Sequence, residues 1–75
     1  MSSVVVYSKN NCPNCDRIKK VLEDNGVEFE YIKDDVKIME VALELRNNNK
    51  LVEMNAPIIM VDGVQIKHTD VRAIV

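Results

Sequence analysis

The sequence predicts one α/β domain over residues 1–75, in which helices flank a four-stranded mixed sheet and the elements follow the order β-α-β-α-β-β-α. Short β-branched runs alternate with segments of helical periodicity. Asp62-Gly63 separates the last two runs, which is a hairpin signal. A chain of 75 residues is too short for a second domain. Because strand-helix-strand crossovers are right-handed, the first two strands should be parallel.

The first half of the chain predicts a strand, a helix and a second strand. The run from Ser3 to Tyr7 is rich in β-branched and aromatic residues, which is typical of a buried strand. A helix is expected over residues 13–25, because Pro13 suits a first helical position and Asn25-Gly26 supplies a left-handed stop. Residues 27–31 alternate apolar and acidic side chains, which indicates an edge strand with one wet face.

A second helix should begin near residue 35. Asp34 or Asp35 can cap it, and it should run to about Asn47. Its apolar positions include Val36, Met39 and Leu43.

The rest of the chain predicts a hairpin and a short last helix. Ile58 to Val61 forms a continuous apolar strand, and Val64 to Ile66 returns antiparallel after the Asp62-Gly63 turn. Thr69-Asp70 can cap a truncated helix that reaches Val75.

Composition excludes several functional classes. The formal net charge of −2 carries no block of like charge, so we expect no nucleic-acid partner and no polybasic membrane patch. No apolar run reaches about 18 residues, and Met1-Ser2-Ser3 does not start a signal peptide. We therefore expect a cytoplasmic monomer that does not contact a membrane.

The only two cysteines of the chain lie in the segment Cys12-Pro13-Asn14-Cys15, directly after the first strand. A disulfide that closes so small a loop stabilises a fold by about 2 kcal/mol at most, so this pair is a poor structural cross-link. In a reducing compartment such a pair serves redox chemistry or binds a metal. At the end of the first strand of a β-α-β unit, it is the thioredoxin-like redox arrangement.

Cys12 is the predicted nucleophile. A free thiol has a pKa of about 8.5, so the attacking sulfur needs stabilisation as a thiolate. If Cys12 caps the first helix, the N–H groups of Asn14 and Cys15 face its sulfur and the helix dipole adds positive charge. Lys9 can add a full charge from the preceding loop. Cys15, one turn further, should be more buried and should resolve the mixed disulfide.

Metal binding is the alternative chemistry for this pair. A closed zinc site needs four ligands, and His68 is the only additional soft candidate in the chain. We expect no metal cofactor, although two chains that share zinc or an iron–sulfur cluster through Cys12 remain an alternative.

Asn55-Ala56-Pro57 precedes the apolar strand that begins at Ile58. Proline often occupies the first position of a strand, so Pro57 can simply mark where this strand begins. Combined with the cysteine helix and the hairpin, this position resembles the one where thioredoxin-like folds place a cis-proline beside the active sulfur, and the resemblance implies a cis peptide bond at Pro57. The backbone of Ala56 would then be open to antiparallel pairing with a substrate.

Together these motifs resemble those of the glutaredoxins, in particular the compact dithiol members of bacteria and phages. The matching segments are Tyr7-Ser8-Lys9, Cys12-Pro13-Asn14-Cys15, Ala56-Pro57, Asp62-Gly63 and Thr69-Asp70. The resemblance covers nearly the whole chain and implies a thioredoxin-like fold. It also implies that Cys12 becomes glutathionylated and that Cys15 resolves protein disulfides.

The resemblance further implies glutathione as co-substrate. Lys9 would meet its glycine carboxylate, Ala56 its cysteinyl backbone, and Thr69 with Asp70 its γ-glutamyl group. Pro13, Asn14 and Pro57 complete the expected binding set. Disulfide-containing proteins are the expected macromolecular substrates, with ribonucleotide reductase as the leading partner.

Two positions depart from the family pattern. Asn14 stands where glutaredoxins usually have an aromatic residue, so a stacking wall is absent. Lys67-His68 replaces a glycine pair that lets ligand backbone approach closely. The second departure leaves an alternative open, in which thioredoxin reductase and not glutathione reduces the protein.

Overall fold

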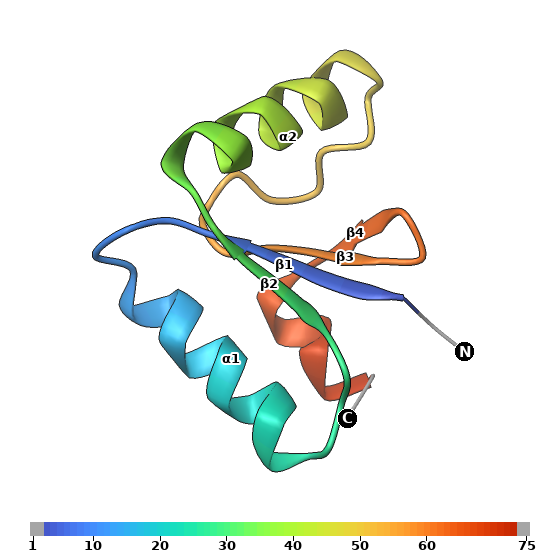
Figure 1. The fold of residues 1–75 in the computed structure, drawn as a ribbon. Coiled ribbons are helices and arrows are strands. Elements are labelled where there is room, and N and C mark those ends of the chain that lie inside the picture. Colours follow the sequence, from blue (N-terminus) through green and yellow to red (C-terminus); the bar gives the residue numbers. More distant parts are fainter. Residues whose placement is uncertain (1–2, 74–75) are drawn as a thin grey trace.

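The computed structural model describes residues 3–73 and contains a four-stranded mixed sheet with helices on both faces (Figure 1). The elements are β1 (Val4–Ser8), α1 (Pro13–Asp24), β2 (Glu30–Lys33), α2 (Asp35–Asn47), β3 (Ile58–Val61), β4 (Val64–Ile66) and the 3-10 helix η1 (His68–Ala73). The predicted order and fold class are confirmed.

The strands lie in the order β2-β1-β3-β4. β1 is parallel to β2 and β4 is antiparallel to β3, as predicted. β1 also pairs with β3, in antiparallel orientation. The hairpin between β3 and β4 turns at Asp62 (φ 52°) and Gly63 (φ 81°). Two consecutive positive φ angles match the right-handed twist of a two-residue hairpin.

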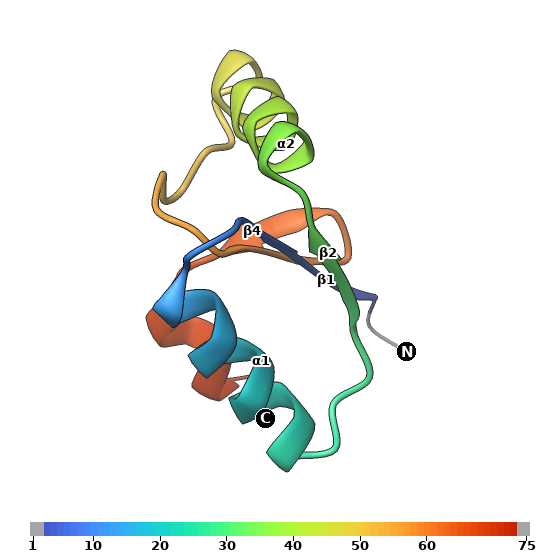
Figure 2. The ribbon, with the colours of Figure 1, turned by 60° about the vertical axis from the view of Figure 1, so that its left-hand side comes forward.

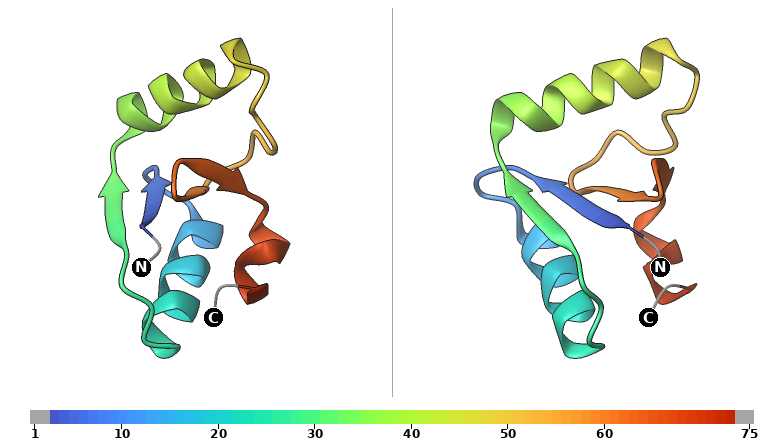
Figure 3. Two further views of the ribbon diagram at one scale, coloured as in Figure 1. Left: turned by 90° about the vertical axis from the view of Figure 1, so that its right-hand side faces the viewer. Right: turned by 45° about the vertical axis from the view of Figure 1, so that its right-hand side comes forward.

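Helices α1 and η1 cover one face of the sheet and α2 covers the other (Figures 2 and 3). Side chains of a strand alternate between faces, so each face has its own core. On the α1 face the buried residues are Val4, Val6, Ile18, Leu22, Ile59 and Val71. On the α2 face they are Ile38, Leu45 and Ile58, with Tyr7 packed against them. Both cores rest on β1 and β3.

The first helix ends where the sequence predicts. α1 stops at Asp24, and Gly26 takes a left-handed φ of 68°. The next strand starts later than expected, because β2 begins at Glu30 and not at residue 27. Since Val5 pairs with Glu30, residues 27–28 lie beyond the start of β1 and have no strand beside them. Phe29 still packs against the α1 face. The alternating pattern therefore indicates that this segment is half-buried, but it does not show which of its residues pair with β1.

Asp34 is the cap of α2. Its Oδ1 accepts hydrogen bonds from the N–H groups of Val36 (2.9 Å) and Lys37 (3.1 Å). The apolar positions singled out from the sequence face solvent, since Val36, Met39 and Leu43 are 67%, 65% and 50% exposed. The helix instead buries Ile38 and Leu45.

The last helix differs from the prediction. η1 is a 3-10 helix that begins at His68, so Thr69 and Asp70 lie inside its first turn and do not cap it. The Asp70 N–H donates to the Lys67 carbonyl (3.0 Å), and the buried Val71 holds the turn against the core. The predicted continuation through residues 74–75 lies outside the described residues. No helix between residues 3 and 73 has the length and apolar composition of a membrane span.

Candidate active site

Cys12 occupies the N-cap of α1. Its backbone is extended (φ −117°, ψ 95°) and Pro13 follows at the first helical position. Its Sγ accepts a hydrogen bond from the N–H of Cys15 at 3.2 Å. The cap predicted from the sequence is therefore present, and Cys15 is its donor. This geometry places the sulfur where the unpaired amides and dipole of a helix favour negative charge.

The two cysteines form a disulfide, with 5.3 Å between their Cα atoms. They differ in exposure: Cys12 is partly exposed, whereas Cys15 is only 1% exposed. A substrate can thus reach the first sulfur and not the second. This asymmetry suits a pair in which one cysteine attacks and the other resolves.

The loop before Cys12 is tied to the start of α2. The N–H of Asp34 donates to the carbonyl of Ser8 (3.1 Å). Asp35 accepts from the backbone N–H of Asn10 (2.9 Å) and from its side-chain amide (3.2 Å). The sequence treated Asp34 and Asp35 as alternative caps, but the first caps α2 and the second supports the cysteine loop. No spacing in the sequence indicates this second role of Asp35.

The segment that ends at Pro57, called the Pro57 loop below, lies beside Ser8. The loop that leads to Cys12, called the cysteine loop, begins at Ser8. The Ala56-Pro57 peptide bond is cis, as predicted. Because Tyr7 pairs with Ile58, the residue before Ile58 lies next to Ser8, where the cysteine loop begins. Pro57 is buried and Ala56 partly buried.

His68 holds the Pro57 loop, a role that the sequence did not reveal. Its ring Nε2 lies 2.7 Å from the carbonyl oxygen of Pro57. Since a carbonyl only accepts, Nε2 carries the proton of this hydrogen bond. Glu53 fixes the other side of the residue: its Oε2 accepts from the His68 backbone N–H (3.1 Å), and its Oε1 lies 3.8 Å from the ring Nδ1. No spacing in the sequence marks Glu53.

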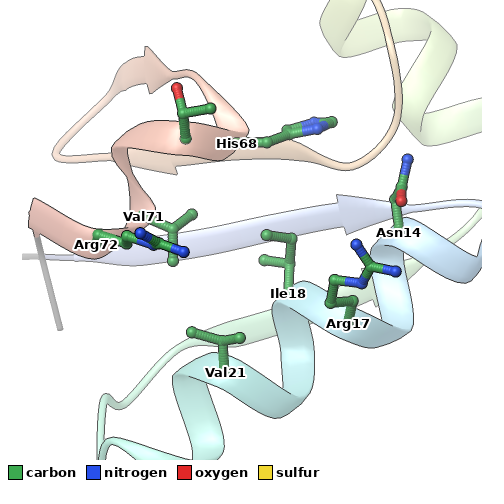
Figure 4. A pocket seen from close by; sticks show the side chains of 8 residues that line it. Asn14, Arg17, Ile18, Val21, His68, Val71 and Arg72 are labelled. Carbon is green, nitrogen blue, oxygen red and sulfur yellow. The ribbon is translucent and has the colours of Figure 1, made fainter.

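A groove of about 500 Å³ runs between α1 and η1 (Figure 4). Its lining residues are Asn14, Arg17, Ile18, Val21, His68, Thr69, Val71 and Arg72. Of the residues expected to bind a ligand, the groove brings together Asn14 and Thr69. Arg17 and Arg72 also line it, and the sequence had not indicated them.

The remaining expected ligand residues do not line this groove. Lys9, Pro13 and Asp70 are exposed, Lys9 on the cysteine loop and Asp70 on η1. Their ligand roles, like that of Ala56, stay predictions. Within residues 3–73 no group of three or more His, Cys, Asp and Glu side chains is placed to hold a metal ion.

Comparison with known proteins identifies similar chains. The sequence profile of the Glutaredoxin family matches residues 4–66. The glutaredoxin-like protein NrdH of Salmonella typhimurium is 38% identical over 34 residues, which cover 45% of this chain and 42% of that protein. The match therefore spans less than half of that relative's length.

Solved structures show the same architecture. Glutaredoxin 1 of Francisella tularensis, crystallised with cacodylate, superposes with a TM-score of 0.74 at 24% identity over 97% of this chain and 91% of its own. A wheat glutaredoxin gives a TM-score of 0.68 at 27% identity, over 95% of this chain and 67% of that one.

Proposed function

Because this chain belongs to the glutaredoxin family, we propose that it is a dithiol thiol–disulfide oxidoreductase that reduces protein disulfides. The observation that carries the proposal is the cysteine pair at the start of α1. Cys12 is accessible and caps the helix, and it is joined to the buried Cys15. Two sulfurs that can bridge reversibly at this position supply two electrons per turnover.

The proposed reaction begins with the reduced pair. The thiolate of Cys12 attacks one sulfur of the substrate disulfide, the substrate bond breaks, and its second sulfur leaves as a thiolate that takes a proton. Cys15 then attacks Cys12 in the mixed disulfide, which releases the other substrate thiol and forms the Cys12–Cys15 bond. Each substrate disulfide gains two electrons and the protein dithiol loses two. The N–H of Cys15 and the start of α1 support the attacking anion.

Glutathione is the first candidate for the molecule that reduces the Cys12–Cys15 disulfide after each turnover. In this proposal Lys9 meets the glycine carboxylate, the Ala56 backbone pairs with the cysteinyl residue, and Thr69 with Asp70 meets the γ-glutamyl group. Pro13, Asn14 and Pro57 contact the same tripeptide. The shared position of Asn14 and Thr69 on one groove supports this arrangement.

Thioredoxin reductase is the second candidate reductant. His68 lies where the family resemblance expects a glycine, and its ring is bonded to the Pro57 carbonyl and lines the same groove. A side chain there restricts the close approach that a tripeptide backbone needs. The similarity to a glutaredoxin-like protein NrdH also favours this candidate. Under either reductant, ribonucleotide reductase is the proposed protein partner.

Two serine variants test the roles of the cysteines. Cys12→Ser is expected to abolish all exchange, because no accessible sulfur remains. Cys15→Ser is expected to retain reduction of small glutathione mixed disulfides and to lose reduction of protein disulfides, because the mixed disulfide with a protein cannot be resolved. Both activities are measured on the same preparations. The reverse pattern would show that the two sulfurs had been assigned to the wrong roles.

The reductant is identified with the unmodified protein in two coupled assays. Both contain a disulfide substrate as the final electron acceptor; one supplies NADPH, glutathione and glutathione reductase, and the other supplies NADPH and thioredoxin reductase. NADPH consumption in only one assay selects that reductant. A metal-bound or coloured protein after anaerobic purification, together with no turnover in either assay, would favour the two-chain metal or iron–sulfur alternative.

A further inference from the structure

We propose that the groove between α1 and η1 is a docking surface for an acidic segment of the disulfide-bearing partner protein. This inference rests on the proposed reductase function and specifies the kind of substrate that the site prefers. In this inference Arg17 and Arg72 determine which disulfide-bearing substrates the protein prefers.

The floor of the groove is apolar. Ile18 and Val21 come from α1 and Val71 comes from η1, and Figure 4 shows these side chains facing one another across the two elements. Such a floor accepts an apolar side chain of a bound segment, because contact with it removes apolar surface from water.

The charged residues of the groove are all basic. Arg17 lies on α1 next to the cysteine motif and Arg72 lies on η1, while no carboxylate among residues 3–73 lines the groove. Within residues 3–73 neither guanidinium takes part in an ion pair. This concentration of positive charge occurs in a chain whose formal net charge is −2. An arginine binds a carboxylate through two parallel hydrogen bonds, so the groove is complementary to acidic side chains.

The position of the groove indicates that the acidic side chains belong to the substrate protein. Asn14 belongs both to the cysteine motif and to the groove wall. A segment that lies on the groove therefore continues toward Cys12. The occupant that fits is the stretch of partner chain flanking its own disulfide, with an apolar side chain between two acidic ones.

Three disulfide-closed peptides of equal length test this preference. They share the same ring and differ in a flanking sequence of Glu-Leu-Glu, Gln-Leu-Gln or Lys-Leu-Lys. The pre-reduced protein is mixed with each peptide, and the second-order rate constant of one turnover is measured, so that neither reductase nor glutathione is needed. We expect the acidic peptide to react about tenfold faster than the basic one at low salt. We expect the difference to shrink at 1 M salt, where screening acts over about 3 Å.

The double variant Arg17→Glu/Arg72→Glu should invert the ratio between acidic and basic peptides. The ratio within one variant is the readout, so an effect of the substitutions on the cysteine thiolate cancels. Lys20→Glu/Lys37→Glu is the matched control: it makes the same change in net charge at two exposed residues outside the groove. It should keep the preference for the acidic peptide. Arg17→Gln/Arg72→Gln is the milder variant, expected to bring the ratio near one.

The outcomes separate this inference from the proposed function. Reduction of all three peptides at equal rates, or an equal change of the ratio in the groove variant and its control, overturns the docking surface and leaves the reductase. If no peptide is reduced, the proposed function itself fails.

Discussion

His68 joins the start of η1 to the loop before β3 through one hydrogen bond from its ring to the Pro57 carbonyl oxygen. Pro57 is buried, so its carbonyl has little access to water as a replacement donor. Loss of the partner of a buried acceptor costs about 1–3 kcal/mol. The histidine thus fixes the loop that the proposed substrate would pair with.

His68→Ala is expected to lower the free energy of unfolding by about 1–2 kcal/mol, since it leaves the carbonyl without its donor. His68→Gln retains an N–H at the end of the side chain and should recover much of this loss. Urea unfolding of both variants measures the effect, with Lys67→Ala at the exposed neighbour as control. An alanine variant as stable as the unmodified protein would mean that the bond does not hold the loop.

Ser8, in contrast to Pro57, carries a buried polar group without a hydrogen-bond partner among residues 3–73. It is fully buried, and the unpaired atom is its Oγ. An unpaired buried hydroxyl is costly, and its removal leaves only a small void. Ser8→Ala should therefore leave the free energy of unfolding unchanged or raise it by about 1 kcal/mol. A clear fall in the urea midpoint would reveal a partner for this hydroxyl.

At the scale of elements, α2 is apolar on two sides. One side buries Ile38 and Leu45 against the sheet, and the other exposes Val36, Met39 and Leu43. Ile38→Ala is expected to cost about 2–4 kcal/mol of unfolding free energy, because it opens a cavity in the core. Met39→Ala, one residue further, should change it by less than about 0.5 kcal/mol. Thermal or urea unfolding of the pair measures this contrast, and equal losses would mean that the face of α2 is assigned wrongly.

The same helix shows what the sequence can and cannot predict. The element order, the hairpin and the cysteine cap follow from local signals: β-branched runs, Pro13, Gly26 and Asp62-Gly63. The parallel first pair follows from the crossover rule for strand-helix-strand units. The buried face of α2 does not, because apolar residues on both sides leave no single periodic stripe to choose. The start of β2 was missed for a related reason, since the length of the neighbouring β1 decides it and no residue near Glu30 does.

The candidate site divides in the same way. Cys12, Cys15 and Pro57 lie in motifs of adjacent residues, so the sequence alone singles them out as candidates. Glu53 and Asp35 act on residues 15 and 25 positions away, through contacts that only the folded chain creates. Long-range partners of this kind leave no spacing pattern to read.

At the scale of the whole molecule, two cores share one sheet. Leu22 is fully buried on the α1 face and Leu45 is buried on the α2 face. The strands between them carry side chains to both sides, so loss of one core should weaken the other. For a chain of this length the total stability is expected to be about 4–11 kcal/mol. A core truncation therefore removes a large share of it.

Leu22→Ala and Leu45→Ala are each expected to lower the free energy of unfolding by about 3 kcal/mol and to keep a single transition. The two tyrosines lie on opposite faces, Tyr7 with the α2 core and Tyr31 with the α1 core, and the chain has no tryptophan. Variants that retain one tyrosine therefore report each face by fluorescence. Two separate midpoints would show that the faces unfold independently.

The anchoring of Ser8 and Asn10 by Asp34 and Asp35 has a consequence for any attempt to reproduce the chemistry in miniature. A synthetic peptide cut from around the two cysteines keeps the sulfurs and the beginning of a helix. It loses both aspartates, which arrive from a distant stretch of chain, and with them the orientation of the segment that presents the first sulfur. We therefore expect the proposed reactivity of these thiols to depend on the assembled domain, and such a peptide should behave as an ordinary flexible dithiol.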